Sequence, residues 1–356
     1  MSSSPAGSAH GGGTFMGMFN EECLRYAKQK RLSIKDKTKL YSMTSADASV
    51  ELLTAESFVD LLAEFDTFIF GADALTWLRE GVILEAASLI NLLLDNDKKV
   101  IILTNDTTET RSTHQSKLAQ HRVSPKITKD SIVTPGLIAA EYIKKFGDAT
   151  KKVYLIASEG VADEMKNCGL QCFGEGPDLL TTTGKEASIF DAGLAVKKDE
   201  VCAVVVGLDR HFIYKKLSKA ANYLKNPSCL FIATSDDPTI SCQNTDVVVP
   251  DAGSIAAAVT KASSRQPVIV GKPHYLSFQF IRKRFKIKKS RTLIVCNSFS
   301  SDVKFGRDHG MRTLLVPSSP RQLEEMEGIR SAGRLDHLPH YYATSISSIL
   351  PSGMRS

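Results

Sequence analysis

Short, uninterrupted runs of apolar residues alternate with helical stretches along most of this chain. Three of these runs lie at residues 66–70, 99–103 and 291–295, and a segment with helical periodicity follows each. A strand that is apolar on both faces must be covered on both faces, as in a parallel sheet between two layers of helices. The pattern therefore predicts an α/β fold with a doubly wound, Rossmann-like parallel sheet.

A second series of apolar strands and helices interrupts the first. Its strands are expected at 152–156, 201–206 and 229–233. An independent α/β domain inserted between the two halves of another explains this order. We expect a loosely ordered tail at 1–50, a core domain in two halves at 51–150 and 265–350, an inserted cap domain at 151–264, and a short tail at 351–356. A strand expected at 267–270 is assigned to the second half of the core.

Composition is that of a globular protein with weak charge. The chain has 356 residues, a formal net charge of +6 and a pI near 8.8, which is weak evidence for a nucleic-acid partner. A basic run at 282–289 could form a nucleic-acid patch. Its apolar members indicate the inner face of a helix and the following turn, so a solvated basic face is favoured. We expect no nucleic-acid partner.

Cysteine usage and hydropathy indicate a reduced, non-membrane setting. The seven cysteines are odd in number and irregular in spacing, and the Ser/Gly-rich start lacks the pattern of a signal sequence. We therefore expect free thiols, as in the cytosol or the nucleus, and predict a cytoplasmic location. Cys168 and Cys172 have no second Cys or His pair nearby that would complete a zinc site. No apolar run is long enough for a membrane helix, and no membrane partner is expected.

Five segments carry a resemblance to a known family. They occur in the family's order and lie at 103–105, 205–212, 230–234, 253–259 and 270–273. From about residue 57 to 349 the chain resembles the phosphoglycolate phosphatase, pyridoxal phosphatase and 4-nitrophenylphosphatase branch of the haloacid dehalogenase superfamily. The resemblance implies a core with a large inserted cap, and Mg²⁺-dependent hydrolysis of phosphate esters through a phospho-aspartate.

The resemblance also implies specific chemical roles. One aspartate attacks phosphorus, and a second aspartate two residues later protonates the leaving alcohol. Carboxylates hold Mg²⁺, while a hydroxyl and a lysine hold the phosphate oxygens. The register of the first motif is set by Trp77 and the strand before it. Gly71 then occupies the nucleophile position and Asp73 the acid/base position. The alternative, that Asp66 is the nucleophile, is disfavoured because Asp66 precedes the strand.

The other motifs are kept only in part. Thr104, Asn105 and Lys272 match the phosphate-binding positions, although Lys272 could also be a solvated lysine. Asn297 stands at the position of a metal-binding aspartate, and Asp302 keeps the last acidic position of that motif.

The sequence leaves the roles of two further acidic residues and one histidine open. In the expected cap, Asp209 and His211 lie within a resembling segment, and a structural role is favoured for His211. Asp73 can be a residual acid/base or can simply cap a turn.

The losses at 71 and 297 predict a catalytically inactive pseudophosphatase that needs no cofactor. Such a protein would bind a phosphorylated small molecule or inorganic phosphate through Thr104 and Lys272, or act through protein contacts. The resemblance implies a homodimer, or pairing with an active relative, through the cap. The alternative is an active phosphate monoesterase that uses Mg²⁺ and, for example, water activated by Asp73. A third hypothesis is a structural or regulatory protein with a vestigial pocket.

Overall fold

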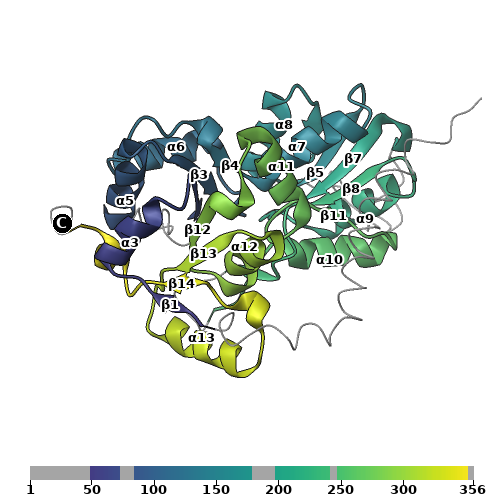
Figure 1. Cartoon of the computed structure of the whole chain (residues 1–356). Helices are drawn as coiled ribbons and strands as arrows, with labels where there is room; N and C mark the ends of the chain where they lie inside the picture. Colours follow the sequence, from purple (N-terminus) through teal and green to yellow (C-terminus); the bar gives the residue numbers. More distant parts are fainter. Residues whose placement is uncertain (1–48, 73–83, 179–196, 241–246, 352–356) are drawn as a thin grey trace, which may run out of the picture. The chain divides into compact units, whose positions relative to one another are not determined.

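The computed structural model describes residues 49–72, 84–178, 197–240 and 247–351 (Figure 1). The chain from Val50 onward forms one compact unit. The predictions for the N-terminal tail, and those for Asp73 and Trp77, lie outside the described residues. No helix in the described ranges is both long and apolar enough to cross a membrane.

The larger sheet has seven parallel strands in the order β1-β14-β13-β12-β2-β3-β4. Its central strands are the apolar runs seen in the sequence, and β2 is buried along its whole length. The doubly wound core predicted from these runs is confirmed. The strands are β1 (Glu51–Leu52), β2 (Thr67–Gly71), β3 (Lys99–Leu103), β4 (Ile132–Val133), β12 (Thr292–Cys296), β13 (Arg312–Leu315) and β14 (Tyr341–Tyr342).

The smaller sheet has five parallel strands in the order β11-β8-β7-β5-β6. They are β5 (Lys152–Ile156), β6 (Cys172–Phe173), β7 (Val201–Val206), β8 (Leu230–Ala233) and β11 (Val268–Ile269). The strand expected at 267–270 therefore pairs with β8 in this sheet and adds nothing to the seven-stranded sheet. An antiparallel pair, β9 (Thr239–Ile240) with β10 (Val249–Pro250), was not expected from the sequence.

Side chains along the strands alternate between two apolar layers. On β2, Phe68 and Phe70 point into a cluster with helices α3 (Ala55–Leu62), α5 (Leu84–Asp95) and α14 (Ile346–Ile349). Ile69 points the other way, into a cluster that continues to Val153 and Leu155 of the five-stranded sheet. This period of two is what a pleated strand imposes. Helices α7 (Pro135–Phe146), α8 (Glu159–Asn167) and α11 (Tyr275–Phe285) supply much of the shared layer.

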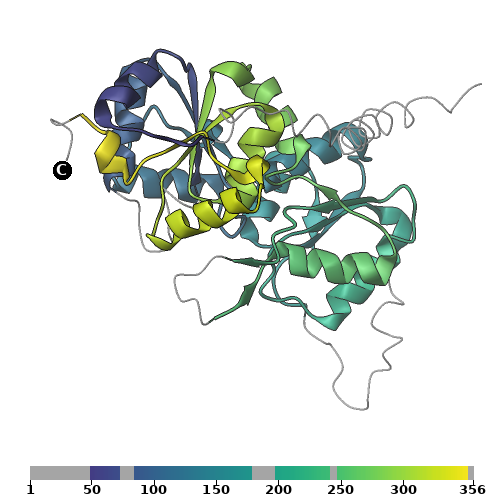
Figure 2. The same cartoon turned by 60° about the horizontal axis from the view of Figure 1, so that its bottom comes forward.

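The remaining helices cover the outer faces. A third cluster joins the far side of the five-stranded sheet to α9 (Tyr214–Tyr223) and α10 (Ala252–Ser263), and Figure 2 shows α10 lying across that sheet. Helix starts follow local sequence signals. Thr134 caps α7 by accepting a hydrogen bond from the Leu137 amide, and Pro135 occupies the first helical turn, where its missing N–H is not needed.

A buried ion pair joins helix α6 (Arg111–Gln120), which follows β3 of the larger sheet, to helix α8, which follows β5 of the smaller sheet. Arg111, the first residue of α6, donates to both carboxylate oxygens of Glu164 on α8, at 2.5 and 3.0 Å. Both side chains are less than 10% exposed. Close by, a Cβ at Gly160 would lie 2.1 Å from the carbonyl oxygen of Glu109, so the backbone of α8 touches the loop after β3 directly. These contacts fix where the five-stranded sheet meets that loop.

His340, just before β14, gives a prediction for the pH dependence of stability. Burial, and secondarily the charges of Arg307 and Arg312, lower the pKa of His340 from 6.5 to about 3. The Nδ1 atom accepts a hydrogen bond from the Thr313 amide, which needs a neutral ring. The unfolded chain binds this proton below pH 6.5 and the folded chain does not, so stability is present above pH 6.5 and is lost as the pH falls toward 3.

We expect urea midpoints to fall between pH 7 and pH 4.5, and His340→Gln to make that fall smaller. The control is the same substitution at an exposed histidine, His211→Gln. Equal pH dependence in the wild type and the His340 variant would contradict the assignment.

Candidate functional site

Three of the singled-out positions meet at one edge of the seven-stranded sheet. Gly71 ends β2, Thr104 follows β3, and Asn297 follows β12. These strands are neighbours, with Gly71 opposite Leu103 and Phe70 opposite Val295. Because all three strands are parallel, their carboxyl ends lie side by side, which is where ligands bind in such sheets. The carboxyl ends of β2, β3 and β12 therefore form one candidate site, whereas Gly271 follows β11 of the five-stranded sheet.

The space beside Gly71 is filled by another residue. A Cβ built on Gly71 would stand 2.5 Å from Oδ2 of Asp302 and 2.8 Å from its carboxyl carbon. Asp302 reaches this point from a π-helical turn, Phe299–Val303, which precedes α12 (Lys304–His309). Any side chain at residue 71 therefore has to displace the Asp302 carboxylate.

The Asp302 carboxylate is paired with Lys272. Oδ1 accepts a hydrogen bond from Lys272 Nζ at 2.6 Å, and both side chains are at most 2% exposed. Lys272 Nζ also lies 3.4 Å from the carbonyl oxygen of Leu103, at the end of β3. A buried lysine and aspartate at this distance compensate each other's charge. The positive charge of Lys272 is therefore offset by the Asp302 carboxylate at this site.

Asn105 connects the core loop to two other segments. Its side-chain oxygen accepts from the Lys272 amide at 2.9 Å, and its side-chain nitrogen donates to the Lys272 carbonyl at 3.1 Å. The same nitrogen lies 2.9 Å from Oδ2 of Asp237, which also accepts from the Ser235 hydroxyl. Asn105 therefore has a positioning role that the sequence did not reveal. It holds Lys272 and the loop after β8 together.

Thr104 forms a hydrogen bond within its own turn, and Asn297 forms one with helix α13 (Arg321–Ser331). The Thr104 hydroxyl is buried and accepts from the Asp106 amide at 2.9 Å, as in a turn. The carbonyl oxygen of Asn297 accepts from Nε2 of Gln322 at 2.6 Å. Cys296 is the last residue of β12. Complete burial and the charge of Asp302 raise the pKa of its thiol, which stays protonated and unreactive.

The two residues singled out in the second α/β series have different surroundings. Asp209 is buried and pairs with Lys216 at 2.5 Å, while its other oxygen accepts from the His211 amide at 2.8 Å. The His211 side chain is exposed. Asp209 therefore fixes the turn between β7 and α9 and neutralises a buried lysine, and His211 takes part in this turn through its backbone amide.

Comparison with known proteins places this arrangement in a family. The family model described as haloacid dehalogenase-like hydrolase matches residues 68–171, and one described as HAD-hydrolase-like matches residues 269–348. Phosphoglycolate phosphatase 2 of Arabidopsis thaliana is 31% identical over 304 residues, which span 84% of this chain and 97% of that one. The chain belongs to the haloacid dehalogenase-like hydrolase family.

Two further comparisons extend this result. A putative NipSnap protein of Caenorhabditis elegans is 35% identical over 257 residues. The match covers 70% of this chain and 48%, about half, of the length of the C. elegans protein. The fold matches that of a p-nitrophenyl phosphatase from Archaeoglobus fulgidus with a TM-score of 0.66, at 22% identity over 80% of this chain and 98% of that chain. The predicted fold class and phosphatase branch are confirmed.

Phosphatases of the haloacid dehalogenase-like family typically use Mg²⁺, and the described residues here do not fit that ion. Mg²⁺ needs octahedral oxygen ligands and depends on carboxylates. Gly71 offers no side chain, Asn297 offers an uncharged amide, and the Asp302 carboxylate is held by Lys272. Within the described ranges, no group of three or more His, Cys, Asp or Glu side chains could hold a metal.

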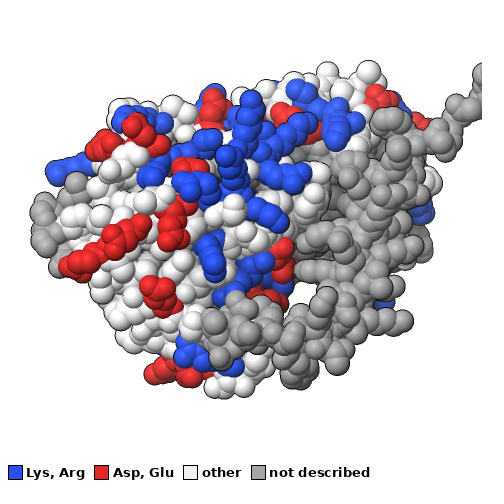
Figure 3. Space-filling view, viewed as in Figure 1, with Lys and Arg blue, Asp and Glu red and all other residues white. Residues whose placement is uncertain are grey.

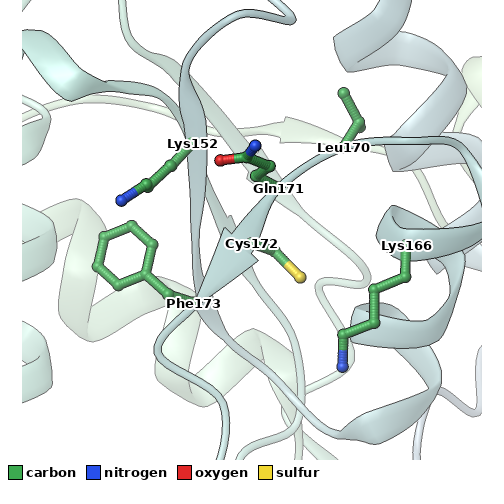
Figure 4. A pocket seen from close by; sticks show the side chains of 6 residues that line it. All are labelled: Lys152, Lys166, Leu170, Gln171, Cys172 and Phe173. Carbon is green, nitrogen blue, oxygen red and sulfur yellow. The ribbon is translucent and has the colours of Figure 1, made fainter.

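A pocket elsewhere in the described part of the chain does not form a second candidate binding site. It has a volume of about 510 Å³ and lies at β6, the edge strand of the five-stranded sheet. Figure 4 shows Cys172 and Lys166 on one side of that strand and Phe173 and Lys152 on the other. Its polar groups therefore do not converge on one point, and Lys166 is already paired with Glu175 at 3.1 Å.

Proposed function

We propose that this chain is a pseudophosphatase, a family member that does not hydrolyse phosphate esters and acts by binding other proteins. The observation that supports this best is the Asp302 carboxylate standing where a side chain of residue 71 would begin. A phospho-aspartate mechanism needs a carboxylate at the end of β2, and glycine has none. Loss of a covalent nucleophile removes activity by about 10⁶-fold in other hydrolases.

The state of Lys272 supports the same proposal. In a working site, a lysine stabilises the charge of the transferring phosphoryl group. Here its ammonium group lies 2.6 Å from a carboxylate in a buried setting. A phosphate dianion would have to compete with Asp302 for this cation, and no Mg²⁺ would offset the repulsion between phosphate and carboxylate. Turnover and tight phosphate binding are both disfavoured by this arrangement.

The test compares the full-length chain with the Arabidopsis phosphoglycolate phosphatase. Each protein is assayed with 4-nitrophenyl phosphate and with phosphoglycolate, with and without Mg²⁺. We expect no Mg²⁺-dependent hydrolysis by this chain, and no change in its melting temperature with Mg²⁺ or inorganic phosphate. Mg²⁺-dependent turnover that is lost in Asp73→Asn would overturn the proposal and favour an active hydrolase with another nucleophile.

A further inference from the structure

The surface at the end of α11 carries six basic residues and forms what we call the α11 patch. All six are exposed, and they are Arg282, Lys283, Arg284, Lys286, Lys288 and Lys289. Figure 3 shows Lys and Arg side chains gathered in the middle of the face on which Figure 1 draws α11. Their combined charge equals the formal net charge of the whole chain, +6, so the remainder of the chain is close to neutral.

The sequence on both sides of the patch contains no acidic residues over a long stretch. Between Asp251 and Asp302 the chain contains ten Lys or Arg and no Asp or Glu. At the average acid content of the chain, 39 in 356 residues, a stretch of this length would hold about five acids. Solvated faces of helices usually mix charges of both signs. A one-signed surface of this size therefore needs a reason beyond solubility.

Neighbouring elements neutralise little of this charge. Arg284 forms an ion pair with Asp130 at 3.0 Å. Asp66 forms its ion pair with Arg291, which lies outside the patch. The charge of Lys288 makes only a minor contribution to lowering the pKa of Asp66. Among the described residues, the other five patch members have no carboxylate within ion-pair distance.

Helix stability explains only a small part of the patch. Cations favour a helix C-terminus, and one or two charges near the last carbonyl groups are enough for that effect. Here the last carbonyl of α11, that of Phe285, accepts from Nζ of Lys99 on β3. Ile281 and Ile287 are buried and fix the orientation of the segment, so the charged side chains are held on the outer face.

The patch lies at the opposite edge of the sheet from the candidate site. Lys99, which contacts the end of α11, is the first residue of β3, whereas Thr104 follows the last residue of the same strand. A ligand on the patch therefore does not reach the Lys272–Asp302 pair. This inference consequently holds whether or not the candidate site turns over a phosphate ester.

We propose that the α11 patch is a docking surface for an acidic segment of a partner protein. Single-stranded nucleic acid is bound on exposed aromatic side chains, and the aromatic residue within the patch, Phe285, is only partly exposed. Binding to a membrane surface uses exposed apolar side chains between the cations. None of the exposed large apolar side chains in the described part of the chain belongs to residues 282–289. Clustered lysines and arginines fit carboxylates, which steer association through charge.

The test uses a fluorescein-labelled poly-glutamate peptide and fluorescence anisotropy with the full-length chain. The patch variant is Lys283→Gln/Lys288→Gln/Lys289→Gln. The control, Lys225→Gln/Lys261→Gln/Arg334→Gln, removes the same charge from exposed positions outside the patch. We expect the patch variant to bind about tenfold more weakly than the wild type, with a smaller salt dependence. The control should bind within about twofold of the wild type.

Two results would overturn the proposal. Equal loss of affinity in both triple variants would mean that net charge, and not the patch, attracts the peptide. Tighter binding of an oligothymidine or of phosphatidylserine vesicles than of the peptide, lost in the patch variant alone, would assign the patch to a different class of partner. Circular dichroism of each variant confirms that the chain remains folded.

Discussion

Replacing Lys272 with methionine is expected to destabilise the protein by about 3–5 kcal/mol, as happens when one partner of a buried ion pair is removed. Lys272 and Asp302 are 2.6 Å apart and at most 2% exposed. Without the ammonium group, the buried Asp302 carboxyl group would have to stay charged without Lys272 or take up a proton, and either state costs free energy. Urea unfolding followed by circular dichroism measures the loss.

Two controls separate the ion pair from a general effect of the substitution. Lys126→Met removes a cation whose pair with Asp95 is exposed, with 59% and 71% of the two side chains accessible, and should change stability by no more than about 1 kcal/mol. Lys272→Met/Asp302→Leu removes both charges and should recover much of the loss, because no uncompensated charge remains. A loss for Lys272→Met as small as that for Lys126→Met would contradict the described pairing.

The fold was predictable because its signal is local. Runs such as 99–103 and 201–206 are apolar at every position, and a buried parallel strand needs this composition. Most strands of two residues carry no such pattern, so β1, β4, β6, β9, β10 and β14 were not predicted. The partner of β11 was misassigned because strand pairing is a tertiary choice. Val268 and Ile269 are apolar enough for either sheet, and only the structure places them beside β8.

The candidate site was predictable in its membership but not in its contacts. The order of the motifs brought Gly71, Thr104 and Asn297 to one edge of the sheet. Asp302 lies 231 positions after Gly71 in the sequence. No sequence pattern predicted that its carboxylate fills the space that a side chain at residue 71 would need. Side-chain direction depends on the π-helical turn that carries Asp302, and such turns have no reliable sequence pattern.

Gly71→Asp/Asn297→Asp is expected to create Mg²⁺-dependent hydrolysis of 4-nitrophenyl phosphate, on the order of 10³-fold above the wild-type background or more. The two substitutions return a carboxylate to the ends of β2 and β12, which are adjacent strands. Two carboxylates at this edge supply the charge that Mg²⁺ needs, and a bound metal supplies the charge neutralisation that phosphate-ester hydrolysis requires. Activity assays and Mg²⁺-dependent melting temperatures check both parts.

Gly71→Asp alone is expected to be inactive and less stable, by about 1–3 kcal/mol, because its Cβ would stand 2.5 Å from Asp302 Oδ2. The Asp302 side chain must then rotate away from Lys272, and the two carboxylates repel each other until a cation lies between them. Mg²⁺ should therefore raise the melting temperature of the double variant more than that of the single variant.

A matched variant controls for added charge. Gly328→Asp/Asn96→Asp introduces the same two carboxylates at exposed positions, and a Cβ at Gly328 meets nothing within 4 Å. It should show neither hydrolysis nor a Mg²⁺-dependent shift. If the site variant folds and binds Mg²⁺ but hydrolyses nothing, the loss of chemistry extends beyond positions 71 and 297. The arrangement of Lys272 with Asp302 would then be the second barrier, because the lysine must leave Asp302 before it can stabilise a phosphoryl group.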